Sequence, residues 1–257
     1  DKTKTEFVSL ASHQLRTPLS TINWYTETIL SGDIGELQED QRPYFEQIYE
    51  STQRMIDLVN ALLNVSRLEM GTFMVEPEEV DIPQLVDDVL DEMEPKIIAK
   101  EIKLTKDYDK KIPQMQLDKQ LTWIILQNLL TNAVKYTPSK GKVTVSVHNR
   151  KANEMIAGTE LEQESIVLAV SDTGYGIPSY QQDQIFSKLF RADNVREKET
   201  EGTGLGLYIV KSIINHIEGQ IWFESTEEEG TTFYVSMPLT GMRKREGTKA
   251  LSAGSYN

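Results

Sequence analysis

One histidine stands among residues that could carry out chemistry, in a helical stretch near the start of the chain. A neutral imidazole is a competent nucleophile near pH 7. At roughly 100° per residue, His13 points away from the apolar Ala11/Leu15 side of that helix. Pro18 lacks a backbone N–H and so loosens the helix one turn later. His13 is therefore either a reachable nucleophile or an ordinary surface histidine of a helical bundle.

A second group of polar residues shares one face of an apolar helix predicted over residues 119–136. Asn128, Asn132 and Lys135 are spaced by four and three residues, which places them on the same side. Amide oxygens can bind Mg²⁺, lysine supplies a positive charge for phosphate, and the ring of Tyr136 can lie against a base. The group indicates a site for a nucleotide with magnesium, and the alternative is a polar stripe on an amphipathic helix.

An aspartate followed by two glycines comes directly after a predicted strand, in the sequence Asp172-Thr-Gly174-Tyr-Gly176. Glycines allow a backbone to turn tightly beside a ligand, and the carboxylate can accept a hydrogen bond from the exocyclic amine of adenine. A simple turn would explain the glycines alone. It would not explain an acidic residue at the end of the strand, so we expect Asp172 to contact a base.

A glycine-rich loop, Gly202-Thr203-Gly204-Leu205-Gly206, leads straight into a predicted helix. Free N–H groups and the positive end of the helix dipole would face phosphates there. The pattern is weak evidence alone, and it is not a Rossmann fingerprint because no βαβ unit precedes it.

The stretch Phe186–Arg191 adds two aromatic residues and the cations Lys188 and Arg191. Its aromatic side chains could hold the charged residues 193–201 as a lid over a site. Each of the four stretches is modest evidence, but together they point to one ligand, a nucleotide with its phosphates.

The composition narrows the class of partner. The chain has 257 residues, with 27 basic and 40 acidic side chains, so its net charge is 27 − 40 = −13. This acidity argues against nucleic acid or an anionic membrane as the main partner, and a polyanionic ligand would need a local cation such as Mg²⁺. The absence of cysteine excludes disulfides and thiol nucleophiles. No apolar run approaches the roughly 18–20 residues that span a bilayer.

The hydrophobic pattern divides the chain into a helical part and a mixed part. Residues 1–70 predict two helices joined by a turn at 31–35, which form an antiparallel hairpin. Its apolar residues, among them Leu15, Ile22 and Tyr25 on the first helix and Met55 on the second, form a one-sided seam that favours a homodimeric four-helix bundle. Residues 71–78 are a connector. Residues 79–240 predict an α/β sandwich, with helices on one face of a mixed sheet. Residues 241–257 are expected to be a disordered tail. The predicted helices of the sandwich are 82–100, 119–136, 179–189 and 205–217, and its strands are 101–107, 142–148, 166–170, 221–224 and 232–237. Residues 149–164 are expected to be a polar loop.

These motifs together resemble the cytoplasmic core of a sensor histidine kinase of a two-component system, over about residues 5–240. Ser12–Pro18 resembles the phosphoacceptor box, Asn128–Tyr136 the asparagine box, Asp172–Gly176 the first glycine box, Phe186–Arg191 the phenylalanine box and Gly202–Gly206 the second glycine box. They occur in the family's order. The resemblance implies a cytoplasmic portion, in keeping with a chain that opens already in helical register and is compatible with a piece of a longer receptor.

The resemblance implies a role for each matched residue. Asn132 would hold Mg²⁺, Asp172 would hold the adenine amine, and His13 would take the γ-phosphoryl group from ATP and pass it to an aspartate of a response regulator. Lys135 with the loop at Gly204 and Gly206 would bind the phosphates. The remaining residues of the implied nucleotide site are Asn128, Tyr136, Gly174, Gly176, Lys188, Arg191, Gly202, Thr203 and Leu205.

Two residues of the phosphoacceptor box concern the reaction itself. Many relatives carry Glu or Asp after the histidine, where it is proposed to accept the second imidazole proton, but this chain has Gln14. An amide can orient that N–H but cannot hold the proton at neutral pH. Thr17 matches the position that orients water in the family's phosphatase reaction, so phosphatase activity toward the regulator is a secondary prediction.

Two other functions compete with this interpretation. A gyrase-type ATPase would carry a glutamate one turn before the Mg²⁺-binding asparagine, but Asn128 occupies that position and cannot act as a base. The second alternative is a non-catalytic ATP-binding scaffold, because Gln14 replaces the Glu or Asp that is proposed to accept the imidazole proton in relatives.

Overall fold

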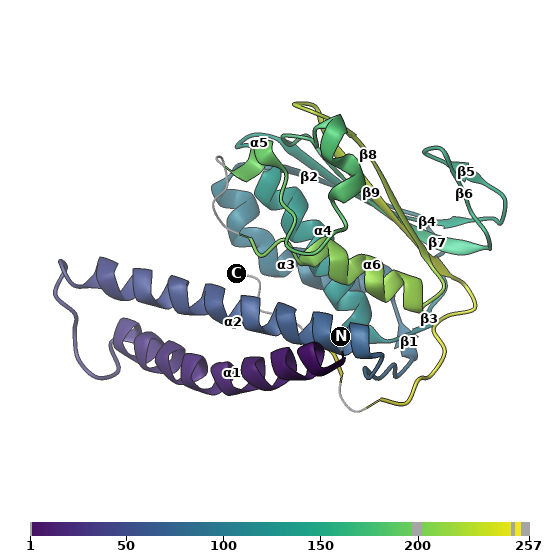
Figure 1. Cartoon of the computed structure of the whole chain (residues 1–257). Helices are drawn as coiled ribbons and strands as arrows, with labels where there is room; N and C mark the ends of the chain where they lie inside the picture. The colour runs from purple at the N-terminus through teal and green to yellow at the C-terminus, as the bar shows by residue number, and fades with distance from the viewer. Residues whose placement is uncertain (1, 197–201, 248–249, 253–257) are drawn as a thin grey trace. The chain divides into compact units, whose positions relative to one another are not determined.

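The computed structural model describes residues 2–196, 202–247 and 250–252, except for the side chains of residues 2–9 and of His13 (Figure 1). The chain divides into two compact units. The first comprises the chain up to Thr72 together with Leu251 and Ser252, and the second comprises Phe73–Ala250. No helix among the described residues is both long enough and apolar enough to cross a membrane.

The first unit is the predicted helical hairpin. Helix α1 (Lys2–Ser31) continues without a break past Pro18, and helix α2 (Arg42–Met70) returns beside it (Figure 1). Pro43 lies in the first turn of α2, where its missing N–H costs little. Gly71 ends the helix in the left-handed conformation, at φ 62°, which a glycine adopts without strain.

The two helices meet through residues spaced by seven on α1. Ser12, Leu19 and Thr26 are buried on that helix, and Leu19 packs into an apolar cluster with Val59 and Leu63 of α2. A repeat of seven keeps one stripe of a helix against its partner. This stripe, rather than the predicted apolar seam, therefore forms the contact within the hairpin.

The predicted apolar seam of α1 remains largely exposed within the single chain. Leu15 is 53% exposed, Ile22 45% and Tyr25 57%. On α2, Met55 is 46% exposed. On α1, Leu15 and Ile22 border the Leu19 stripe, about 40° and 60° around the helix from Leu19, and Tyr25 lies about 120° away. Their side chains therefore lie beside the contact with α2 rather than in it.

The second unit is built on a five-stranded mixed sheet in the order β2-β4-β7-β9-β8. The pair β2–β4 is parallel, and the other neighbouring pairs are antiparallel. The strands are β2 (Lys103–Tyr108), β4 (Lys142–Arg150), β7 (Ser165–Asp172), β8 (Gln220–Thr226) and β9 (Gly230–Pro238).

Three helices cover one face of this sheet: α3 (Ile82–Ala99), α4 (Lys119–Tyr136) and α6 (Gly206–His216) (Figure 1). The first four residues of β7, Ser165–Leu168, are all buried. Successive side chains point to opposite faces of a strand, so this pattern means that both faces of the sheet are covered here. The α/β sandwich predicted from the sequence is therefore confirmed.

The opposite face carries a smaller apolar cluster. Leu161 and Val167 pack with Trp222, whose ring stacks on Tyr234 at 5.3 Å between centroids. Leu161 follows two very short strands, β5 (Met155–Ile156) and β6 (Thr159–Glu160), in a segment that the sequence had indicated as a loop. Strands of two residues are too short to show a hydrophobic period.

The remaining short elements frame the sheet. Strand β1 (Glu78–Val80) pairs antiparallel with β3 (Met115–Leu117). A 3₁₀ helix, η1 (Ser179–Gln184), replaces the first part of the helix predicted at 179–189. A single turn, α5 (Asp193–Arg196), lies within the segment predicted as a lid. Residues 197–201 of that lid lie outside the described residues.

The segment expected to be disordered makes defined contacts where it is described. The N–H of Met242 donates to the Gln116 carbonyl at 2.8 Å, and Arg245 forms an antiparallel bridge with Val75. Leu251 is only 1% exposed. The polar composition predicted disorder, but Met242 and Leu251 supply buried apolar anchors between the polar residues. Residues 248–249 and 253–257 of this segment lie outside the described residues.

Candidate active site

Helix α4 carries the asparagine stretch, residues Asn128–Tyr136. The helix begins at Lys119, as the sequence predicts. The carboxylate of Asp118 caps the helix by accepting the Leu121 N–H at 2.9 Å, and its second oxygen accepts the Glu76 N–H at 2.8 Å. Asn132 and Lys135 are half-buried on the last two turns. A cap that fixes the first turn fixes the rotation of the whole helix, and thus the direction of these two side chains.

Asn128 lies deeper than Asn132 and Lys135. Its amide group donates to the Ile124 carbonyl at 2.7 Å, one turn back in the same helix. A Cβ atom added at Gly206 would overlap the Asn128 side-chain oxygen. The first residue of α6 therefore packs directly on the asparagine stretch, and this contact requires a glycine.

The glycine-rich loop brings three predicted side chains together. A Cβ atom at Gly202 would lie 3.0 Å from Lys135 Nζ and 3.9 Å from both Arg191 Nε and Tyr136 Oη. Gly202 has a φ of +123°, a conformation that side chains disfavour. The cations of Lys135 and Arg191 and the ring of Tyr136 thus surround a space beside Gly202 that a side chain at this position would enter.

The phenylalanine stretch lies against the same loop. A Cβ atom at Gly204, where φ is +69°, would be 2.8 Å from the carbonyl carbon of Leu189 and the carbonyl oxygen of Phe190. Thr203 Oγ accepts the Leu205 N–H at 3.2 Å, and Leu205 is buried. Close backbone packing therefore joins two motifs that are separate in the sequence.

Aromatic contacts hold the phenylalanine stretch on its other side. Phe186 meets Phe223 of β8 edge to face, with 6.0 Å between the ring centroids, and Lys211 Nζ lies 4.8 Å from the Phe186 ring centre. Lys188 lies 5.1 Å from the ring centre of Tyr208 on α6. A cation over an aromatic ring contributes only modestly to stability at an exposed position. The main role of these contacts is therefore to fix the position of the segment.

Asp172 ends strand β7 beside the C-terminal end of α4. Its carboxylate accepts the Gly174 N–H at 2.8 Å. A Cβ atom at Gly174 would be 2.6 Å from both this carboxylate and the Tyr136 carbonyl oxygen. Burial raises the pKa of the Asp172 carboxyl to about 6, although hydrogen bonds from the Gly174 and Thr231 backbone oppose the shift.

One contact around the first glycine stretch was not found from the sequence. Asn194 on α5 donates to the carbonyls of Tyr175 at 3.3 Å and Gly176 at 3.1 Å. The residues are 18 to 19 positions apart, and no local pattern links them. Gly176 itself has a φ of +61°, and a Cβ atom there would overlap the Thr226 carbonyl.

The phosphoacceptor stretch lies in α1 of the first unit. Gln14 and Thr17 are exposed on the helix surface, and the Thr17 carbonyl accepts the Thr21 hydroxyl at 3.0 Å. Arg16 donates to the Asn60 side chain on α2 at 2.7 Å. The predicted outward direction of the His13 side chain lies outside what the structure describes.

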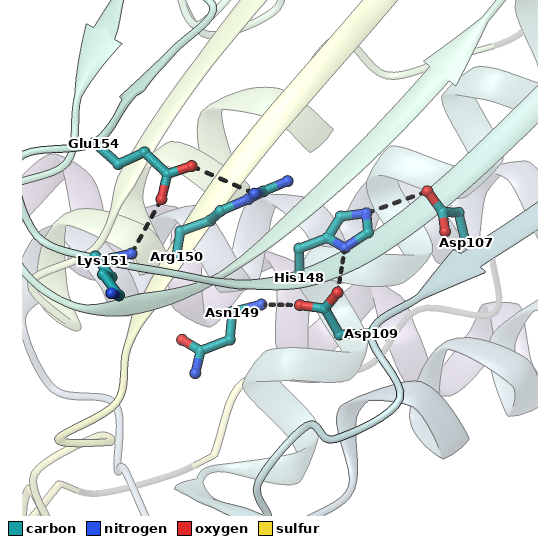
Figure 2. A network of polar contacts seen from close by, with 7 residues as sticks. All are labelled: Asp107, Asp109, His148, Asn149, Arg150, Lys151 and Glu154. Carbon is teal, nitrogen blue, oxygen red and sulfur yellow. Dashed lines mark hydrogen bonds and ion pairs between the residues drawn. The ribbon is translucent and has the colours of Figure 1, made fainter.

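The other two histidines are engaged in local contacts. Figure 2 shows His148 on β4 between Asp107 and Asp109, at 3.3 and 3.0 Å. The His148 contact and the Asn149 N–H lower the pKa of Asp109. His216 Nδ1 lies 2.6 Å from the Ser212 carbonyl. Both arrangements fit structural roles within the second unit.

Comparison with known proteins identifies the two units. Residues 3–71 match the family model of the His Kinase A (phospho-acceptor) domain. Residues 118–241 match the model of the histidine kinase-, DNA gyrase B-, and HSP90-like ATPase. A phosphoacceptor hairpin followed by this ATPase fold defines a histidine kinase core, and the chain belongs to the histidine kinase family.

Similar proteins of known identity agree with this. Sensor histidine kinase WalK of Bacillus subtilis (strain 168) is 32% identical over 241 residues, which cover 93% of this chain and 37% of that protein. Adaptive-response sensory kinase SasA of Rippkaea orientalis (strain PCC 8801 / RF-1) is 33% identical over 236 residues, covering 90% of this chain and 57% of that protein. The crystal structure of full-length ShkA in complex with AMPPNP has a TM-score of 0.71 at 26% identity, covering 93% of this chain and 47% of that chain.

This chain therefore spans between 37% and 57% of the length of these three relatives. All three comparisons confirm the resemblance to sensor histidine kinases and the predicted fold class. The phosphoacceptor match and the kinase relatives do not favour a gyrase-type ATPase or a non-catalytic scaffold.

Proposed function

We propose that this chain is an ATP-dependent protein-histidine kinase core, which phosphorylates His13 and transfers the phosphoryl group to an aspartate of a response regulator. The observation that carries the proposal is the meeting of four separate sequence stretches around Gly202, Gly206 and the end of α4. Together the stretches supply chemistry suited to the base, the phosphates and the metal ion of one nucleotide.

The residues of the second unit fit ATP. The space beside Gly202 lies next to Lys135 and Arg191, whose positive charges suit phosphate oxygens. Helix α6 begins at Gly206 without a capping contact from a described side chain, so its first N–H groups can donate to phosphate. The half-buried carboxylate of Asp172 suits the adenine amine, with Tyr136 flanking the nucleotide.

The donor set also fits a magnesium ion that arrives with the nucleotide. The amide oxygen of Asn132 is a hard ligand of the kind Mg²⁺ accepts. No group of three or more potential ligands among His, Cys, Asp and Glu occurs in the described part of the chain. Magnesium would therefore be held by Asn132 and the phosphates, and it would neutralise phosphate charge during transfer.

The reaction needs few protein groups beyond these. A neutral imidazole nitrogen of His13 forms a bond to the γ-phosphorus as the bond to the bridging oxygen breaks and ADP leaves. Positioning and charge neutralisation dominate such a transfer. The remaining imidazole proton passes to water, with Gln14 orienting the N–H. The carboxylate of the regulator's aspartate then attacks the same phosphorus, and the bond to His13 breaks.

We also propose that the hairpin of residues 1–70 forms a homodimer and that its partner in transfer is the receiver domain of a response regulator. The exposed apolar side chains of α1 and α2 support the dimer. A cytoplasmic location follows from the same proposal, since the resemblance is to cytoplasmic kinase cores.

The exposed hydroxyl of Thr17, one turn after His13, supports a phosphatase reaction toward the phosphorylated regulator. We expect Thr17→Ala to slow regulator dephosphorylation at least tenfold while autophosphorylation stays within twofold, because the hydroxyl orients water and does not contact ATP. Loss of phosphate from the purified phosphorylated regulator measures this. Unchanged dephosphorylation in the variant would remove the phosphatase prediction.

One experiment tests the kinase itself. Incubation with γ-³²P-labelled ATP should give acid-labile, base-stable labelling of the chain, and His13→Ala should abolish it. His148→Ala is the matched control, because His148 is held by two carboxylates in the second unit and its loss should leave labelling intact. Nucleotide binding without labelling would favour a scaffold instead.

A further inference from the structure

Two residues far along the chain lie in contact with the helical hairpin. The side chain of Asn64 on α2 accepts the Ser252 N–H at 2.9 Å and donates to the Ser252 carbonyl at 2.7 Å. One amide thus satisfies both backbone groups of one residue, as a neighbouring strand would. The partners are 188 positions apart in the sequence.

The hairpin side of this contact is buried. Asn64 is 0% exposed, and a buried amide without hydrogen-bond partners is unfavourable. Asn60, Asn64 and Arg67 are spaced by four and three residues, so they share one face of α2. Leu251 is 1% exposed, which gives the segment an apolar anchor next to its polar one.

Positive charge gathers around the Ser252 hydroxyl. Arg16 of α1 and Arg67 of α2 each place a guanidinium nitrogen 3.5 Å from Ser252 Oγ. Burial lowers the pKa of Arg67, and the charge of Arg16 lowers it further, so the two guanidinium groups are close enough to repel. An anionic group at position 252 would relieve that repulsion, because guanidinium pairs are well suited to carboxylate and phosphate.

We propose that Asn64, Arg16 and Arg67 form a docking site on the hairpin for the chain's own Leu251–Ser252 segment, and that negative charge at position 252 tightens the docking. The ligand class is an extended peptide whose backbone pairs with Asn64 and whose second residue carries a hydroxyl or an acid. Arg16 is three residues after His13, so the docked segment holds a side chain of the phosphoacceptor stretch. The docking itself does not depend on the proposed kinase activity.

Amide hydrogen exchange in the whole chain tests the docking directly. The Ser252 N–H should exchange at least tenfold more slowly than its intrinsic rate, because it is bonded to a buried side chain. Leu251→Asp should return it to within threefold of that rate, since a charge cannot occupy the buried position. This variant changes only the docked segment, so the fold of the hairpin is not at risk.

A charge series tests the arginine pair. Relative to intrinsic rates, residue 252 should exchange more slowly in Ser252→Asp than in the unchanged chain, and fastest in Ser252→Lys. Thr240→Asp is the matched control, because it adds the same charge at an exposed position and should leave exchange at 252 unchanged.

Two results would overturn the proposal. Exchange of the Ser252 amide at its intrinsic rate in the unchanged chain would mean that the segment does not dock. An equal effect of Thr240→Asp and Ser252→Asp would mean that Arg16 and Arg67 have no specific role. Neither measurement uses ATP, so the proposal and the kinase function fail independently.

Discussion

At the scale of single residues, the burial of Asp172 changes the pKa of the carboxyl group that is proposed to bind the adenine amine. Its carboxyl is held at the end of β7 by the Gly174 N–H, and burial raises its pKa to about 6. The folded state therefore holds this proton up to a higher pH than the unfolded chain does. The residue's contribution to stability is greatest below about pH 4 and decreases as the pH rises through 6.

The same pKa predicts a pH dependence of nucleotide binding. If the ionised Asp172 accepts the adenine amine, ADP affinity should be about tenfold lower at pH 5 than at pH 7, following the ionised fraction of a group with a pKa of about 6. Titration calorimetry at both pH values measures this. Asp172→Asn is the control, and it should show weaker binding with only the nucleotide's own pH dependence. An equal pH dependence in both proteins would contradict the role of Asp172.

Gln14 is the residue at which this chain departs from the family pattern. We expect Gln14→Glu to raise the single-turnover rate of autophosphorylation at least tenfold, because a positioned general base typically contributes 10²- to 10⁴-fold. Gln47→Glu adds the same charge at an exposed position of α2 and should have no effect. No gain in the Gln14→Glu variant would show that proton acceptance does not limit the rate.

At the scale of elements, the site depends on how closely α6 approaches α4. Asn128 is anchored to its own helix through the Ile124 carbonyl, so it cannot move away from Gly206 without losing a buried hydrogen bond. The missing side chains of the glycine-rich loop let the helices meet, and in the proposed function its backbone N–H groups donate to phosphate. The proposed phosphate binding and the packing of α6 on α4 therefore both favour glycine at this position.

This contact predicts the effect of one added methyl group. In Gly206→Ala the new Cβ would overlap Asn128, and relief of the overlap should cost about 1–3 kcal/mol of stability and weaken ATP binding at least tenfold. Denaturant unfolding and calorimetry measure the two effects. Gly158→Ala is the control, because that position has open space but a φ of +76°, so it should lose some stability and no affinity. Normal ATP affinity in Gly206→Ala would contradict the proposed site.

At the scale of the whole molecule, the hairpin leaves apolar surface that one chain does not cover. Leu15, Ile22 and Tyr25 of α1 follow the predicted seam and are 53%, 45% and 57% exposed. Burying one such side chain contributes roughly 1.5–3 kcal/mol. A second copy of the hairpin would supply the missing half of a four-helix bundle.

We therefore expect a homodimer in solution. Light scattering at micromolar concentration should give about 59 kDa, twice the 29.3 kDa of one chain. Ile22→Glu combined with Met55→Glu should shift the mass toward one chain, because both side chains are exposed on the hairpin and charge at a helix interface is costly. Gln47→Glu serves again as the control. A monomer in the unchanged chain would contradict the prediction.

Caps, proline positions and hydrophobic periods within short segments were enough to predict most helices and strands. Asp118 and Pro138 bracket α4, which the structure gives as Lys119–Tyr136, and alternation of valines predicted β4. The pairs β1–β3 and β5–β6 were missed because strands of two or three residues show no period. The order of the strands also required the structure, since pairing depends on contacts between distant segments.

The sequence by itself determined the two-unit organisation, the family and the list of chemical groups, because caps, glycines and hydrophobic periods act over a few residues. Only the tertiary structure decided that Gly206 packs on Asn128, that Lys135 and Arg191 meet beside Gly202, and that Ser252 pairs with Asn64. These contacts join residues that are tens of positions apart or, for Asn64 and Ser252, 188 positions apart. Their geometry depends on the packing of whole helices, to which no local pattern is sensitive.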